Sequence, residues 1–187
     1  MRRRLRPERT KAMGSRYRNI KAVGQEYRNS CWAASLSWWL KATNKRNIPE
    51  WEILDDDEYS DLWDSPQGST TISEQGLLKV MKDARWGMTH QKIDSGSDFS
   101  GAVLAAHLNF GPVYIGYYDV VVGGGHVNVI YAMDGPMEYP RVYAMEPAYK
   151  KKSDGTFKGM HVDRGLSYYR GNKVILASPS QKISLDR

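Results

Sequence analysis

The hydrophobic pattern of the chain changes its period near residue 110, and this change limits the folds that the sequence can form. Before that point, apolar residues recur at helical spacing and predict helices over residues 31–42, 72–84 and 97–109. After it, β-branched and aromatic residues alternate or cluster, which predicts strands over residues 112–118, 126–133, 141–145, 162–169 and 173–177. Helices that precede strands in this way predict an α+β domain, with helices packed against an antiparallel sheet.

Local signals mark where the later helices begin. Thr71 and Glu74 match a capping box, which predicts the start of the second helix, and Ser97 or Asp98 is expected to cap the third. A short helix is expected near residues 49–54. The acidic stretch that follows it lacks the glycine and the spacing of a calcium loop, so we expect a solvated acidic surface, with docking of the basic N-terminus as the alternative.

The positive charge of the chain is confined to its N-terminus. Its 187 residues suit one domain and carry a net charge of +6. Residues 1–18 contain eight Arg or Lys and one Glu, a net charge of +7, so the other 169 residues carry −1. We expect residues 1–22 to form a flexible arm or linker and residues 23–187 to form the folded domain. A nucleic-acid interface over the whole domain is not expected.

The numbers of cysteine and histidine residues exclude several classes of protein. Cys31 is the single cysteine, so neither an intrachain disulfide nor a four-cysteine zinc site can form. The four histidines are scattered and have no HExxH spacing, so neither a metal nor a cofactor is expected. No stretch approaches the roughly 20 apolar residues of a membrane span, and no apolar segment follows the basic N-terminus as in a secretory signal.

Cys31 has the sequence surroundings of a reactive thiol. It stands at the predicted start of a long apolar helix, which Asn29 or Ser30 is expected to cap, and unpaired N–H groups at a helix N-terminus favour a thiolate. Gln25 lies six residues earlier, where its amide can donate a hydrogen bond to an oxyanion formed at the cysteine. The segment therefore predicts a nucleophile together with an oxyanion donor.

A base and its orienting acid are expected on two neighbouring strands. His126 opens a predicted strand after three glycines, where the bare backbone leaves room for a substrate. Glu146 ends the next strand, directly before Pro147. If these strands pair as a hairpin, Glu146 reaches His126 and is expected to accept a hydrogen bond from its Nδ1–H. Asp134 is the alternative acid.

Four short segments resemble those of compact bacterial papain-like cysteine proteases, a group that includes secreted effectors and the processing peptidases of bacteriocin exporters. Gln25 and Cys31-Trp-Ala match the pattern Q-x5-C-W-A, and residues 125–129 resemble the G-H-x-V-x-V strand that carries the histidine. Residues 111–115 resemble the G-P strand that precedes it, and residues 142–147 resemble the strand that ends in an acid and proline. The resemblance spans residues 22–150.

The resemblance implies a papain-like catalytic domain over residues 23–187 that cleaves a protein substrate. Cys31 would be the nucleophile, His126 the general base and acid, Glu146 the orienting acid and Gln25 an oxyanion donor. Plant and lysosomal relatives use Asn at the position of Glu146, and bacterial relatives usually use Asp, so this chain departs from the pattern by one methylene group. No cofactor is implied.

Because residues 1–22 are too short and too charged to act as an autoinhibitory pro-segment, we expect a secreted or delivered toxin or effector that acts in the reducing cytosol of a target cell. Such an enzyme would need a cognate inhibitor, or immunity protein, over its active site. Amidase, deamidase or acyltransferase chemistry on the same triad is an alternative. A rival of another class is a non-catalytic binding domain with a basic, nucleic-acid-contacting arm.

Overall fold

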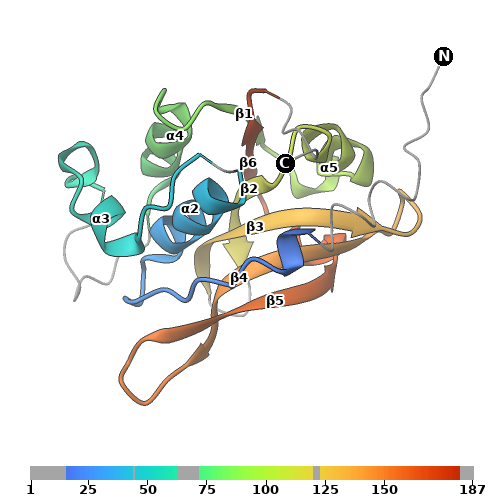
Figure 1. Cartoon of the computed structure of the whole chain (residues 1–187). Helices are drawn as coiled ribbons and strands as arrows, with labels where there is room; N and C mark the ends of the chain where they lie inside the picture. Colours follow the sequence, from blue (N-terminus) through green and yellow to red (C-terminus); the bar gives the residue numbers. More distant parts are fainter. Residues whose placement is uncertain (1–15, 44, 63–71, 120–122, 182–187) are drawn as a thin grey trace.

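A computed structural model of the protein describes residues 16–43, 45–62, 72–119 and 123–181. The first half of the chain is helical and the second half forms the sheet, so the predicted α+β architecture is confirmed (Figure 1). The α-helices are α2 (Cys31–Ala42), α3 (Glu50–Leu54), α4 (Glu74–Lys82) and α5 (Gly101–Leu108). The short 3-10 helices are η1 (Asp57–Tyr59), η2 (Gly96–Asp98) and η3 (Leu166–Tyr169).

One six-stranded antiparallel sheet, with the strand order β1-β6-β2-β3-β4-β5, forms the body of the molecule. Its strands are β1 (Met88–Ile93), β2 (Val113–Asp119), β3 (Gly124–Asp134), β4 (Arg141–Lys151), β5 (Phe157–Gly165) and β6 (Val174–Pro179). The hairpin of β4 and β5 extends beyond the rest of the sheet (Figure 1). The strand predicted over residues 162–169 ends at Gly165, because η3 follows.

Alternate residues of the central strands belong to two separate hydrophobic clusters, because successive side chains of a strand point to opposite faces of the sheet. Val129 lies in the cluster of α2, α3 and α4, whereas its neighbour Ile130 lies in the cluster of α5. β3 is therefore buried on both faces, which explains its nearly continuous apolar sequence. The apolar run predicted a strand correctly, and only the fold shows that both of its faces are covered.

Helix α2 is buried on all sides, as its apolar sequence suggests. Every residue except Lys41 is buried, and Trp32, Trp38 and Trp39 are among the largest fully buried side chains of the described residues. A helix that is apolar all round is typical of a central position in a core. Because α2 is enclosed, its first residue is fixed relative to the sheet.

Several element boundaries differ from the sequence expectations. Ser73, not Thr71, caps α4 by accepting a hydrogen bond from the Gly76 N–H at 3.0 Å; Thr71 lies outside the described residues. Ser100 caps α5, because the expected start at Ser97 or Asp98 forms the separate helix η2. Strand β1 was not expected, because it is a largely polar edge strand in which only Ile93 is buried.

The domain boundary expected after residue 22 does not separate an arm from the body. Tyr17 is fully buried, and its ring lies 6.5 Å from that of Trp38 and 6.2 Å from that of Tyr131. The carbonyl of Ile20 accepts a hydrogen bond from His161 Nε2 at 2.8 Å. Residues 17–22 therefore belong to the packed domain, whereas residues 1–15 lie outside the described residues and their flexibility stays a prediction.

Candidate active site

Cys31 is the first residue of α2 and is buried, with 3% of its surface exposed. Ser30 occupies the N-cap position, but its side chain makes no capping hydrogen bond. Its hydroxyl instead accepts from the N–H of Tyr27 at 3.1 Å and donates to the carbonyl of the same residue at 3.0 Å. The N–H groups of the first helical turn are thus not consumed by a cap, and they remain available to stabilise negative charge at the sulfur or at a bound oxyanion.

His126 lies close enough to Cys31 for the cysteine to raise the pKa of its ring. It stands near the start of β3, opposite Tyr117 of β2, and the two rings make an edge contact at 5.9 Å between centroids. Only 6% of His126 is exposed. The structure therefore brings together the two residues that the sequence proposed as nucleophile and base, although they are far apart along the chain.

Glu146 completes the group from β4. Strands β3 and β4 pair as expected, with Val129 opposite Met145, and this register brings Glu146 to His126. Its Oε1 lies 2.6 Å from Nε2 of His126. The expectation that the carboxylate holds Nδ1 is wrong, because Nε2 makes this contact and Nδ1 is the ring nitrogen left for the sulfur.

The alternative acid, Asp134, lies elsewhere. It ends β3, eight residues beyond His126, where it is paired with Arg141 in the sheet register. Its Oδ2 accepts a hydrogen bond from the Tyr143 hydroxyl at 2.7 Å. Because strand residues rise about 3.3 Å each, Asp134 is out of reach of the His126 ring.

Two further side chains contact Glu146 and were not identified from the sequence. Asn128 Nδ2 donates to Oε2 at 3.1 Å, and Arg164 Nη1 donates to the same oxygen at 2.9 Å. Neither residue is a catalytic position of a motif in the sequence. One indication for Asn128 is present in the sequence. It follows His126 by two residues, and such residues of a strand lie on the same face of the sheet.

The charges of this group shift the pKa values of His126 and Glu146 in opposite directions. Burial would lower the pKa of His126, but the charges and hydrogen bonds of Cys31 and Glu146 raise it to about 10. Burial would raise the pKa of Glu146, but the hydrogen bond and charge of His126, the Ala148 N–H and Arg164 lower it to about 2. An imidazolium and a carboxylate are therefore both favoured over the neutral pH range.

Gln25 is held next to this group by the strand hairpin. Its backbone N–H donates to the Pro147 carbonyl at 3.1 Å, and its carbonyl accepts from the Phe157 N–H at 2.9 Å. A side chain on the preceding residue, Gly24, would overlap the Phe157 carbonyl, so this close approach requires glycine. Residues 24 and 25, which precede Cys31 in the chain, therefore pack against the hairpin of β4 and β5. The contact lies where the register of the two strands shifts between Glu146 and Lys150.

The side-chain amide of Gln25 is engaged within its own loop. Nε2 donates to the carbonyls of Tyr27 and Arg28, both at 2.7 Å, and the buried Oε1 has no hydrogen-bond partner among the described residues. Gln25 therefore braces the loop that leads to Cys31. Donation to an oxyanion requires the exchange of one of these two hydrogen bonds, and such rearrangements on substrate binding are common in active sites.

We expect Gln25→Ala to lower turnover by about 10²- to 10³-fold, the usual loss for one oxyanion donor. The Michaelis constant should change little, because the donor acts on the developing charge and not on the bound substrate. Steady-state kinetics of Gln25→Ala, with Gln75→Ala on the exposed side of α4 as the control, measures the two parameters separately. A change in the Michaelis constant alone would assign Gln25 to substrate binding.

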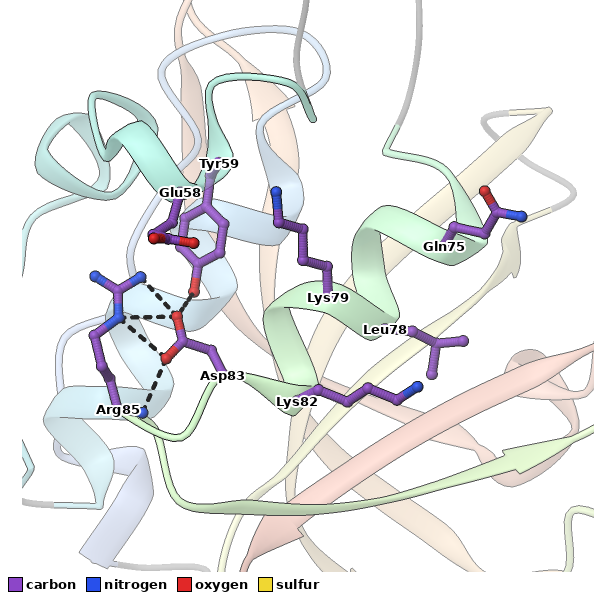
Figure 2. Close-up of a pocket in the computed structure, with 8 residues that line it drawn as sticks. All are labelled: Glu58, Tyr59, Gln75, Leu78, Lys79, Lys82, Asp83 and Arg85. Atoms are coloured by element: carbon purple, nitrogen blue, oxygen red, sulfur yellow. Dashed lines mark hydrogen bonds and ion pairs between the residues drawn. The ribbon is translucent and has the colours of Figure 1, made fainter.

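A surface hollow of about 770 Å³ lies away from these residues, between η1 and α4. Figure 2 shows that two of its charged side chains contact each other: Asp83 binds the guanidinium of Arg85, and the Tyr59 hydroxyl donates to the same carboxylate. Lys79 binds Asp61 at 2.8 Å. The acidic stretch is thus partly neutralised by cations of the domain itself, and none of the residues proposed for chemistry lines this hollow.

Neither a metal site nor a membrane span is found in the described part of the chain. No three His, Cys, Asp or Glu side chains of that part are grouped in a way that would hold a metal ion. None of its helices has the length and the apolar character that a bilayer crossing requires.

Comparisons with known proteins identify one family. The family model described as papain-like cysteine protease AvrRpt2 matches residues 15–162. No curated protein matches the chain. The crystal structure of UfSP from C. elegans superimposes with a TM-score of 0.47 at 17% sequence identity, over 88% of this chain and 31% of that one. The chain thus spans less than a third of the length of that structure.

Proposed function

The chain belongs to the family of papain-like cysteine proteases described as AvrRpt2, and on this premise we propose that Cys31, His126 and Glu146 form its catalytic triad. As a member of this family the protein is a cysteine peptidase, and the alternative of a non-catalytic binding domain no longer applies. The observation that carries the triad is that His126 lies between Cys31, the first residue of a buried helix, and Glu146, with which it is hydrogen-bonded.

In the proposed reaction, the Cys31 thiolate attacks the carbonyl carbon of a peptide bond. His126 gives the proton on its sulfur-facing nitrogen to the leaving amine, which leaves a thioester on Cys31. His126 then removes a proton from water, which hydrolyses the thioester and regenerates the thiol. Glu146 keeps a proton on Nε2 and so fixes the orientation of the ring. The backbone N–H of Cys31 and the amide of Gln25 stabilise the oxyanion of each tetrahedral intermediate.

We further propose that this bacterial-type protease is a secreted or delivered toxin or effector that cleaves a protein in the cytosol of a target cell. Its resemblance to compact effector proteases supports this role. The single cysteine supports it as well, because a fold without disulfides tolerates a reducing cytosol that also keeps Cys31 reactive. An active protease of this kind endangers its producer, which favours a cognate inhibitor, or immunity protein, that covers Cys31 and His126.

Expression of the chain in bacterial and yeast cytosol tests the toxin proposal. We expect the wild-type protein to arrest growth in at least one host, whereas Cys31→Ala should be harmless at the same expression level. Normal growth of both hosts with soluble wild-type protein that still reacts with a thiol alkylator would overturn the proposal.

Mass spectrometry of proteomes incubated with wild-type protein or with Cys31→Ala identifies the reaction itself. New peptide termini that depend on Cys31 would establish proteolysis. A gain of 1 Da at glutamine, without new termini, would instead show deamidation, and a mass increase at an acceptor amine or hydroxyl would show acyl transfer. All three reactions use Cys31 as the nucleophile. The experiment therefore identifies the type of reaction without depending on which residues assist Cys31.

A further inference from the structure

Glu146 is held by more hydrogen bonds than an orienting acid needs for one imidazole. Oε1 accepts from His126 Nε2 at 2.6 Å and from the Ala148 N–H at 3.0 Å, and Oε2 accepts from Asn128 at 3.1 Å and from Arg164 at 2.9 Å. Glu146 is only 3% exposed. The two donors on Oε2 fix the rotation of the carboxylate, so that Oε1 can face only the His126 ring.

Arg164 is itself fixed independently of the triad. It lies on β5, and its side chain is 21% exposed. Its guanidinium stacks on the ring of Tyr168, 4.1 Å from the ring centroid. The Tyr168 hydroxyl in turn donates to Asp119 Oδ2 at 2.6 Å. Arg164 therefore presents its charge to Glu146 from a position that η3 and β2 hold in place, and not from a freely moving side chain.

We propose that Arg164 is a positioning residue that holds Glu146 Oε2 and offsets the carboxylate charge, and that it thereby sets the pH range in which the Cys31 thiolate and the His126 imidazolium coexist. This inference rests on the proposed triad. This role also accounts for the glutamate at position 146. Its side chain has one more rotatable bond than that of aspartate, so a second hydrogen-bond donor does more to fix its orientation. A buried carboxylate without a cation would also oppose a thiolate nearby.

Few other charges surround the triad in the described residues. Besides the triad itself, the titratable and charged groups that face it are Tyr114, Tyr117 and Asp119 from β2, Arg164 from β5, and Tyr168 and Tyr169 from η3. Burial raises the pKa of Tyr117 well above its usual value and that of Tyr169 to about 12, so both stay neutral in an ordinary assay. Arg164 is thus the permanent cation of this group.

Removal of the Arg164 charge should move the pH dependence of the active site to higher pH. Without the guanidinium, Glu146 places an uncompensated negative charge beside the ion pair. The thiolate then forms only at higher pH, and the imidazolium also keeps its proton to higher pH. Both limbs of the pH profile should therefore move upward together, by about one pH unit. A mere loss of stability would lower activity at every pH without moving either limb.

The test uses the pH dependence of Cys31 alkylation, which needs no knowledge of the substrate. Because Cys31 is the single cysteine, all label from iodoacetamide reports on it, and inactivation by an epoxysuccinyl reagent adds the alkaline limb, because that reaction uses the imidazolium. We expect Arg164→Met to shift the profile upward and Arg164→Lys to restore most of it. Arg164→Gln keeps a hydrogen-bond donor without the charge and should shift like Arg164→Met, which gives a second reading if Arg164→Met folds poorly.

Arg141→Met is the matched control. Arg141 also pairs with a carboxylate across β4 and β5, at 2.9 Å from Asp163, but its side chain is 63% exposed and does not contact the triad. Its alkylation profile should equal that of the wild type. Folded Arg164→Met and Arg164→Gln proteins with the wild-type profile would overturn the role of Arg164. A wild-type profile with the midpoint of an ordinary thiol, about pH 8.5, would overturn the proposed triad instead.

Discussion

Cys31→Ala is expected to abolish peptidase activity, with a loss on the order of 10⁶-fold, as found when the nucleophile of a comparable triad is removed. The thiolate forms the covalent bond to the substrate, and no other described residue offers a thiol. The fold should survive, because alanine fits the space of a buried cysteine at a helix start and single changes of this kind cost about 1 kcal/mol.

Two measurements check this expectation. An epoxysuccinyl reagent should add one molecule of label to each wild-type protein molecule and none to Cys31→Ala. Circular dichroism and thermal unfolding should give similar results for both proteins. Lys41→Ala, at the exposed end of the same helix, serves as the control and should keep full activity. Activity that persists in Cys31→Ala would disprove the assignment of the nucleophile.

His126→Ala is expected to cause a loss of the same order, about 10⁶-fold, whereas Glu146→Ala should cost less, about 10⁴-fold. His126 both activates the sulfur and protonates the leaving amine, while Glu146 acts only through the ring that it orients. Although plant and lysosomal papain relatives have an amide side chain, that of Asn, at this position, Glu146→Gln is also expected to lower activity. Its NH₂ group would face either the Nε2–H of His126 or the donors of Asn128 and Arg164.

The ratio of turnover to Michaelis constant, measured for the three variants on one peptide substrate, gives this order. Asp134→Ala is the control, since Asp134 lies at the far end of β3 and binds Tyr143. A loss in Asp134→Ala equal to that in Glu146→Ala would contradict the assignment of the acid. Equal losses in His126→Ala and Glu146→Ala would mean that Glu146 does more than orient the ring.

Features that depend on local spacing could be predicted from the amino-acid sequence. The apolar run after Cys31 predicted a helix with the cysteine at its start, and six residues separate it from Gln25 whatever the fold. The change of hydrophobic period predicted helices followed by a sheet, because burial imposes a spacing of 3.6 on a helix and of 2 on a strand. The pairing of two neighbouring strands was also expected, since short connections favour hairpins.

Contacts between segments that are far apart in sequence could not be predicted in this way and depend on the packing of the whole fold. The register of β3 against β4 selects Glu146 over Asp134, and it assigns Nε2 and not Nδ1 to the carboxylate. Tyr17 looked like part of a charged arm, yet a pocket of aromatic rings buries it. Arg164 lies on a strand beyond the recognisable motifs, and it reaches Glu146 because β5 pairs with β4. Local spacing contains no information about such contacts, because sheet register and side-chain direction are set when the whole core packs.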